Sequence, residues 1–395
     1  MRILLIHNKY GKFSGEESVL EAQMMLLENQ GNEVHIYSRR SEELNGFWAK
    51  TNAFFSGFYN YRSVSEIKQL ISTFRPEIVH IHNLYPLISP AVLSTIHRFH
   101  IPIVMTVHNY RLVCPNGLFF YNGEICERCA GGNEWNCIIK NCEGSFPKSL
   151  GYSLRNFYAR KRRLFSSNIC RFICLTDFQK EKLMKNGFTR EKIFVLPNFL
   201  DAKHKEDNPI SSKSYIAFSG RVNGQKGFDL IIKAMNFLET EYTLNKVLPI
   251  LTAGQCDSVF ISQFKIPESI KFLGTLPKEE MDNYYRNARF LVFTSRSYEG
   301  APIVFLEAMK HHLPVIAPRL GAYPEIIEDG VNGLLFSPGD PVDLADKISS
   351  LSSNEDLCFR LGENGYRKLV EKYSPEIHYK QLISIYKQVI EETSL

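Results

Sequence analysis

Short apolar runs alternate with amphipathic stretches along the chain, a pattern typical of parallel α/β folds. In the first half, strands are predicted at 3–6, 33–38, 78–83, 101–109, 171–176 and 192–198. The stretch from Glu16 to Gln30 predicts a helix after the first strand, and Gly31 ends it. The runs are almost continuously apolar, as expected of strands buried on both faces of a sheet.

The alternation restarts after a charged, apolar-poor stretch at 201–214, which we interpret as an interdomain linker. Strands are then predicted at 215–220, 247–254, 269–274, 288–295, 313–318 and 333–338, the last closing the sheet. Ser374 is the predicted N-cap of a final helix that begins at Pro375. A chain of 395 residues exceeds what one hydrophobic core usually serves. The predicted organisation is therefore two α/β domains, 1–200 and 215–373, followed by a helix over 374–395.

Composition adds a charge asymmetry to an otherwise ordinary globular chain. Residues 1–200 contain 25 Lys/Arg and 16 Asp/Glu, a net charge of +9, whereas the remainder carries 22 and 26, a net charge of −4. The densest part is 155–163, here called the basic segment, which predicts either a solvated helix face or a patch that binds an anionic membrane. No recognised nucleic-acid motif accompanies it, so no nucleic-acid partner is expected.

No apolar run approaches the roughly 20 residues needed to span a bilayer. The N-terminal residues are interpreted as a strand and not as a signal peptide. We therefore expect a cytoplasmic protein, with the inner face of the cell membrane as its possible surface of attachment.

The stretch 297–327 holds the strongest candidate chemistry. Glu299 and Gly300 are predicted in a loop after a strand, and Pro302 starts a helix that carries Glu307. The start of a helix offers free N–H groups and a partial positive charge, which suit a phosphate. Glu307 lies on an otherwise apolar helix, where its carboxylate needs donors such as the hydroxyls of a ribose. The alternative is an exposed helical glutamate paired with a lysine.

A second loop carries two cations directly after the strand at 215–220. Arg221 and Lys226 flank a glycine-containing loop that precedes the next helix. Two fixed cations opposite a helix start form an anion clamp. Alone this signal is weak, because surface lysines are common.

Together these segments resemble the family-4 retaining glycosyltransferases of the GT-B fold. Glu299 and Glu307 match that family's E-x7-E pattern, and 220–227 matches its G-R-x4-K-G loop. The segment 330–348 matches the next segment of the family's consensus, and the resemblance covers nearly the whole chain. It implies two facing Rossmann-like domains, a donor bound by the second of them, and a C-terminal helix that returns to the first.

The resemblance also implies the site residues. The catalytic set is His108, Glu299, Arg221 and Lys226, and the donor-binding set is Gly15, Gly220, Arg221, Lys226, Gly274, Leu276, Glu299, Gly300, Ala301, Pro302, Ile303 and Glu307. Arg221 and Lys226 would neutralise the donor diphosphate, and Glu307 would bind the ribose. Family members more often have Phe-Gly at Ala301-Pro302, which bears on contacts to the donor sugar.

In the first half, Gly15 stands where the family has a glycine-rich loop, although Ser14 replaces a second glycine. His108, at the end of a strand, matches a histidine that the family places beside the transferring sugar; the alternative is a buried histidine with structural partners. His80 and His82 are expected to have structural or supporting roles.

The implied reaction is sugar transfer with retention from a nucleotide-diphosphate sugar to a glycan or lipid-linked acceptor, in cell-surface polysaccharide synthesis. Catalysis would rest on electrostatic stabilisation of the diphosphate, with no cofactor and no Asp-x-Asp metal motif. The alternatives are a GT-B sugar-nucleotide epimerase or a phosphorylase, and a zinc-stabilised nucleic-acid-binding module. An oxidoreductase is disfavoured because no G-x-G-x-x-G follows the first strand.

Five cysteines, the cysteine cluster, crowd into an insertion at 114–145. Cys126-x2-Cys129 with outer thiols has the count and spacing of a structural zinc site, and Cys114 is a third ligand. The fourth is open between Cys137 and Cys142, and the resemblance favours Cys142. The rival interpretations are reduced buried thiols and a local disulfide.

Overall fold

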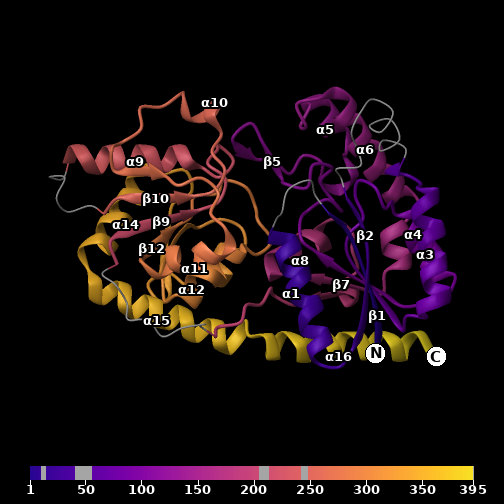
Figure 1. Cartoon of the computed structure of the whole chain (residues 1–395). Helices are drawn as coiled ribbons and strands as arrows, with labels where there is room; N and C mark the ends of the chain where they lie inside the picture. Colours follow the sequence, from indigo (N-terminus) through magenta and orange to yellow (C-terminus); the bar gives the residue numbers. More distant parts are fainter. Residues whose placement is uncertain (10–14, 41–55, 204–212, 242–247, 395) are drawn as a thin grey trace. The chain divides into compact units, whose positions relative to one another are not determined.

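The computed structural model describes residues 1–9, 15–40, 56–203, 213–241 and 248–394. The chain forms two compact units (Figure 1): the first comprises Met1–Phe119, Cys126–Asn198 and Glu376–Leu395, and the second Phe120–Ile125 and Phe199–Pro375. Most of the expected linker, 204–212, lies outside the described residues. The short segment Phe120–Ile125 groups with the second unit, although the sequence assigned the whole insertion to the first domain.

The first unit is built on a six-stranded parallel sheet of order β2-β1-β3-β4-β7-β8. The strands are β1 (Arg2–Lys9), β2 (Glu33–Arg40), β3 (Ile78–Asn83), β4 (Ile103–Val107), β7 (Arg171–Cys174) and β8 (Ile193–Val195). Every residue of β3 is buried, including His80, His82 and Asn83, as expected of a central strand covered on both faces.

Helices cover both faces of this sheet. They are α1 (Gly15–Asn29), α3 (Tyr61–Phe74), α4 (Ala91–His97), α8 (Asp177–Lys185) and α16 (Pro375–Ser394), with the 3-10 turn η3 (Arg190–Lys192). Leu4 and Ile6 of β1 pack with α3 and α4, whereas Ile3 and Leu5 pack with α1 and α16. The period of two along a strand sends these neighbours to opposite faces. The predicted final helix is confirmed, and it packs on the first unit (Figure 1).

The insertion between β4 and β7 has its own secondary structure. It contains β5 (Phe120–Tyr121), β6 (Glu124–Ile125), η2 (Ala130–Gly132), α5 (Trp135–Lys140), α6 (Phe146–Lys161) and α7 (Leu164–Asn168). β5 and β6 pair as an antiparallel hairpin. Ala159 of α6 and Phe165 of α7 are buried in the core of the first unit, so the end of this region is anchored to the sheet.

The second unit is a second six-stranded parallel sheet, of order β11-β10-β9-β12-β13-β14. Its strands are β9 (Tyr215–Ser219), β10 (Ile250–Ala253), β11 (Ile270–Phe272), β12 (Ala288–Val292), β13 (Val315–Pro318) and β14 (Gly333–Phe336). The prediction that the last strand closes the sheet is confirmed, because β14 is an edge strand.

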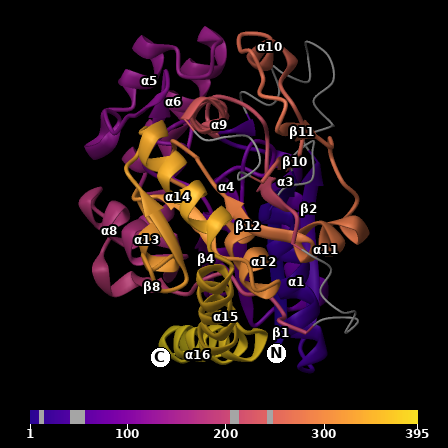
Figure 2. The same ribbon diagram turned by 90° about the vertical axis from the view of Figure 1, so that its left-hand side faces the viewer.

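Seven helices described in the second unit cover its sheet. They are α9 (Phe228–Glu241), α10 (Ser258–Ile261), α11 (Lys278–Arg286), α12 (Ile303–Lys310), α13 (Tyr323–Ile326), α14 (Pro341–Ser353) and α15 (Glu355–Lys372). α9 and α14 lie side by side on one face (Figure 2), and α11 and α12 pack on the other. The predicted fold class, two parallel α/β units, is therefore confirmed.

The strand order places a topological switch point in the second sheet. From β9 the chain moves to β10 and β11 on one side and then to β12 on the other. The loops that follow β9 and β12 therefore leave two neighbouring strands at the switch point, and open α/β sheets bind ligands at the carboxyl ends of such strands. Both candidate loops of the sequence, the one with Lys226 and the one with Glu299, are these two loops.

Candidate functional site

The loop that follows β9 is docked on the segment that follows β12. Arg296 donates its backbone N–H to the Gln225 carbonyl over 3.0 Å, and the Thr294 hydroxyl donates to the Lys226 carbonyl over 2.8 Å. Gly227 has a φ of +67°, and a Cβ there would lie 2.1 Å from the Thr294 carbonyl oxygen. Only glycine allows this approach, so the loop conformation is fixed by sequence.

This docking brings Lys226 to Glu299. Lys226 Nζ lies 2.6 Å from Glu299 Oε1, and the two side chains are only 19% and 24% exposed. Lys226 Nζ also lies 5.6 Å from the centre of the Phe293 ring. A partly buried ion pair, a charge-assisted hydrogen bond between Lys226 and Glu299, therefore lies at the switch point.

Aromatic packing fixes the loop that carries Glu299. Phe293, Phe305 and Tyr323 meet edge to face, with ring centroids 4.8 to 5.8 Å apart. The Tyr323 hydroxyl donates to the Ser297 carbonyl over 2.6 Å. Such aromatic pairs hold defined geometry beyond their burial, so the segment leading to Glu299 is held on a rigid base.

Arg221 is not brought to this pair. It directly follows Gly220, its side chain is exposed, and its guanidinium forms no ion pair within the ranges that the structure describes. Its neighbours are tied to the next loop, because Gly220 donates to the Ala253 carbonyl and Val222 to the Gln255 carbonyl, each over 2.9 Å. Of the two predicted clamp cations, Lys226 forms an ion pair with Glu299, and Arg221 does not.

Glu307 lies on α12, which begins at Ile303 after the N-cap Pro302, so the predicted helix start is confirmed within a residue. The Tyr285 hydroxyl donates to Glu307 Oε2 over 2.8 Å. Burial raises the pKa of the Glu307 carboxyl, and the hydrogen bond from Tyr285 opposes that rise. The partner in the structure is therefore a tyrosine from α11, not the lysine of the alternative interpretation. No sequence signal marked Tyr285.

The other predicted donor residues belong to both units. Gly274 has a φ of +74°, and its carbonyl accepts from Gly254 N over 2.7 Å. A Cβ on Gly254 would lie 2.0 Å from the Gly220 carbonyl oxygen, so the loops after three neighbouring strands pack backbone on backbone. Leu276 packs on the adjacent core. Gly15 is the first residue of α1, and residues 10–14 of the expected glycine-rich loop lie outside the described residues.

His108 follows β4 in the first unit and is hydrogen-bonded to a second histidine. His82 Nδ1 lies 2.8 Å from His108 Nε2, and the rings stack with centroids 5.1 Å apart. Burial lowers the pKa of His108 to about 3 and that of His82 well below the usual value. Both imidazoles are therefore neutral at physiological pH, so His108 can orient a substrate by a hydrogen bond but does not carry a positive charge.

His80 lies next to this pair with every ring nitrogen occupied. Its Nδ1 lies 2.6 Å from the Tyr386 hydroxyl of α16 and 3.0 Å from Gln23 Nε2 of α1, and its Nε2 lies 2.8 Å from Thr106 Oγ1. These contacts tie β3 to two helices and to β4, which fits the structural role expected for His80.

The basic segment divides into inward and outward residues. Arg155 is buried, with its guanidinium carbon 3.8 Å from the centre of the Tyr85 ring and 4.4 Å from that of Tyr152. Arg160 forms an ion pair with Glu134 over 2.7 Å. One cation of the segment is thus buried and a second, which is itself 48% exposed, is paired with a buried carboxylate; the charge count alone did not reveal this. No helix in the described ranges has the length and apolar content that crossing a bilayer requires.

The cysteine cluster consists of free thiols. The Cys137 and Cys142 side chains are hydrogen-bonded to each other, and burial raises the pKa of Cys129 to about 12. Among the described residues, no group of three or more His, Cys, Asp and Glu side chains is arranged to hold a metal ion. The four predicted ligands, Cys114, Cys126, Cys129 and Cys142, therefore lack a metal-binding geometry here, and zinc stays a prediction without geometric support.

Comparisons with known proteins agree with this fold. Residues 13–204 match the family model for Glycosyltransferase Family 4, and residues 201–368 match that for Glycosyl transferases group 1. An uncharacterized glycosyltransferase of Methanocaldococcus jannaschii is 30% identical over 259 residues, which cover 65% of this chain and 68% of that protein. The poly(ribitol-phosphate) alpha-N-acetylglucosaminyltransferase of Staphylococcus aureus is 25% identical over 248 residues, 62% of this chain and 47% of that protein.

The structure of Anabaena HepE in complex with UDP and glucose superposes with a TM-score of 0.67 at 16% identity, over 98% of this chain and all of that one. The fold is therefore GT-B, and the protein is a sugar-nucleotide glycosyltransferase. The chain belongs to glycosyltransferase family 4.

Proposed function

We propose that the protein transfers a sugar, with retention of anomeric configuration, from a nucleotide-diphosphate sugar to a glycan or lipid-linked acceptor in cell-surface polysaccharide synthesis. The observation that carries this proposal is the ion pair between Lys226 Nζ and Glu299 Oε1, 2.6 Å apart at the β9/β12 switch point. It supplies a cation and a carboxylate where open α/β sheets bind ligands.

In the proposed reaction, the donor diphosphate takes over Lys226 and lies near the N–H groups at the start of α12. Arg221, exposed in the same loop as Lys226, adds the second cation once an anion is bound. These groups stabilise the charge that develops as the bond between the sugar C1 and the diphosphate breaks. The acceptor oxygen forms the new bond to C1, and its proton leaves with the diphosphate or to solvent. No divalent ion is required, because fixed cations supply the stabilisation.

Glu307 and His108 are the proposed orienting groups. One carboxylate oxygen of Glu307 keeps its hydrogen bond from Tyr285, and the other accepts from the ribose hydroxyls. His108, neutral and held by His82, contacts the transferring sugar. Holding both reactants in place is itself a large part of such catalysis.

Two observations support the proposed acceptor and membrane attachment. The name of the Staphylococcus aureus relative gives poly(ribitol-phosphate) as what that protein acts on. Lys161 and Arg162 of the basic segment are exposed. We propose a cytoplasmic protein that attaches to the inner face of the membrane through these residues. Co-sedimentation with anionic vesicles at low salt tests this, and absence of binding would remove the membrane part alone.

The enzymatic proposal is tested in two steps. A thermal-shift screen against nucleoside diphosphates and sugar nucleotides identifies the donor, because a ligand of the native state raises the melting temperature. NMR of the product made from that donor, with EDTA present, then gives the anomeric configuration. We expect the configuration of the donor to be kept and turnover to survive chelation. An inverted product, or an epimerised donor with no transfer, would overturn the proposal.

A further inference from the structure

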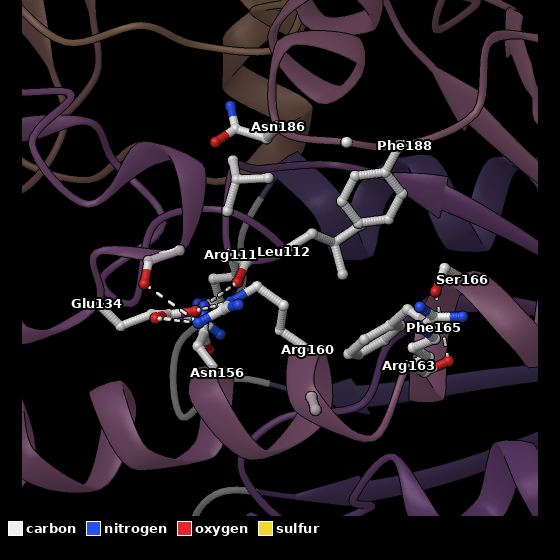
Figure 3. Close-up of a pocket in the computed structure, with 14 residues that line it drawn as sticks. Arg111, Leu112, Glu134, Asn156, Arg160, Arg163, Phe165, Ser166, Asn186 and Phe188 are labelled. Carbon is white, nitrogen blue, oxygen red and sulfur yellow. Dashed lines mark hydrogen bonds and ion pairs between the residues drawn. The ribbon is translucent and has the colours of Figure 1, made fainter.

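A cavity in the first unit lies against the loop that follows β4 and His108. Its volume is about 100 Å³, more than a single bound water needs. Its walls come from that loop, from α6 and α7, and from the end of α8. Figure 3 shows the Glu134–Arg160 pair on one side, Arg163 with Ser166 on the other, and Phe188 above them.

The charged groups on these walls do not cancel. Three arginines and one carboxylate line the cavity: Arg111, Arg160, Arg163 and Glu134. Glu134 is buried and accepts from Arg160 at both oxygens, over 2.7 and 3.1 Å. Arg163 forms no ion pair with any carboxylate in the described part of the chain. The one carboxylate on the wall is therefore bound to Arg160, and Arg111 interacts with the Glu143 carboxylate, which does not line the cavity. Arg163 is the cation of the wall that this leaves for a ligand.

The backbone at Arg163 is unusual. Its φ of +51° and ψ of +30° are left-handed, and it is the residue that starts α7. This backbone conformation is unfavourable for a residue that has a Cβ atom, whereas glycine adopts it freely. Strained positions of this kind gather at ligand sites. Arg163 is exposed and lines the cavity, so its guanidinium is accessible to a ligand there.

A second cavity adjoins the first and reaches the histidine pair. It is lined by His82 and His108, and it shares Arg111, Leu112 and Phe165 with the first cavity. The shared side chains place Arg111 between the histidine pair and the cavity that holds Arg163. A molecule with a hydroxyl near His108 therefore has a cationic and partly apolar surface directly beside it.

We propose that this cavity binds a phosphate group of the acceptor, with Arg111 and Arg163 as cationic ligands and Leu112, Phe165 and Phe188 against an apolar portion. Guanidinium groups bind phosphate through paired N–H donors, and arginine is the side chain suited to this geometry. The inference rests on the proposed function, because it names the acceptor class of that transfer: a phosphate-bearing amphiphile or sugar phosphate.

The test measures phenyl phosphate binding by calorimetry, since this probe joins a phosphate to an apolar ring. Arg163→Gly removes the guanidinium and relaxes the backbone, so its melting temperature should not fall below that of the wild type. Arg162→Ala removes the neighbouring exposed cation, which does not line the cavity, and is the matched control. We expect the Kd to rise about 10-fold or more in Arg163→Gly and to stay unchanged in Arg162→Ala.

Equal weakening in both variants, or no binding to the wild type, would overturn the proposal. Competition with geranyl phosphate and with glucose 1-phosphate then separates a lipid source of the phosphate from a sugar phosphate; failure of both to displace the probe also counts against it. Melting shifts with nucleoside diphosphates are recorded in parallel. If these shifts are present while phenyl phosphate does not bind, only the acceptor inference fails. If they are absent, the proposed function fails independently.

Discussion

Lys226 and Glu299, separated by 73 positions in the sequence, form an ion pair of 2.6 Å at the carboxyl ends of two adjacent parallel strands. The pair exists because Gly227 allows the loop after β9 to approach the Thr294 carbonyl. A carboxylate in this position neutralises the cation until a more strongly bound anion replaces it. In the proposed function, Lys226 is held in place before a diphosphate binds, and Glu299 is then released for another contact.

Glu299→Ala separates these two roles. Without the carboxylate, Lys226 has no internal partner to exchange, so nucleoside diphosphate should bind as tightly as to the wild type or more tightly. Transfer should fall about 100-fold, because the contact of Glu299 with the donor sugar is lost. Calorimetry gives the Kd and steady-state kinetics give kcat/KM. Full activity in this variant would contradict the proposed contact of Glu299 with the donor sugar.

Glu307→Gln should lose activity without losing stability. Burial raises the pKa of Glu307, so the charged form is disfavoured in the folded protein, and this group contributes stability at low pH that is lost as the pH rises through its folded-state pKa. A neutral amide avoids that loss and still accepts from Tyr285. We expect an unchanged or higher melting temperature near pH 7 and a fall in transfer of about 100-fold. A destabilised variant would contradict this view of Glu307.

Acid should destabilise the first unit before pH 5 is reached. His80, His82, His108 and His378 are buried there, and desolvation lowers each pKa below the ordinary 6.5, to about 3 for His80 and His108 and about 4 for His378. The unfolded chain therefore binds more protons, and stability is lost as the pH falls from about 6.5 toward these values, by about 1.4 kcal/mol per pH unit for each histidine.

Urea unfolding at several pH values, followed by tryptophan fluorescence, measures this effect, because Trp135 lies on α5 of the first unit. His378→Gln should reduce the slope of stability against pH by about one proton. His97→Gln, at an exposed position, is the control that should leave the slope unchanged. Equal stability at pH 7 and pH 5 would refute the prediction.

Arg155→Ala should destabilise the protein without weakening vesicle binding. Arg155 stacks between Tyr85 and Tyr152 and donates to the Pro115 carbonyl over 3.2 Å. Losing this buried contact should lower the free energy of unfolding by about 3 kcal/mol, whereas Arg162→Ala should change it by less than about 0.5 kcal/mol. Vesicle binding, where present, should depend on Arg162 and not on Arg155.

Much of the fold could be predicted because each parallel strand is an apolar run whose period and boundaries are local properties. The start of α12 also followed from the sequence, since Pro302 marks it within a residue, whereas the close approach of Gly227 to Thr294 did not. The contacts of the site could not be predicted in this way. Tyr285 reaches Glu307 from another helix, and His82 reaches His108 from another strand. Such pairs depend on strand order and helix packing, which no local pattern encodes.

Charge density was the least reliable guide. The sequence of the basic segment predicted that its cations share one exposed surface. In the structure Arg155 is buried between aromatic rings and Arg160 is paired with Glu134. A count of charges contains no information on which face of a helix each one occupies. The cysteine cluster shows a similar limit, because ligand spacing alone does not determine the geometry in which neighbouring thiols lie, and zinc binding stays a prediction.

The most direct test of the donor site compares nucleoside diphosphate binding to Lys226→Ala and Lys233→Ala. Lys233 lies on α9, is 56% exposed and pairs with Asp229 over 3.6 Å. It is the control because it is also an ion-paired lysine but lies outside the loops after β9 and β12. Calorimetry should show a Kd close to that of the wild type for Lys233→Ala and a Kd at least about 100-fold weaker for Lys226→Ala. Undiminished binding to Lys226→Ala would contradict the proposal that the loops after β9 and β12 bind the donor diphosphate.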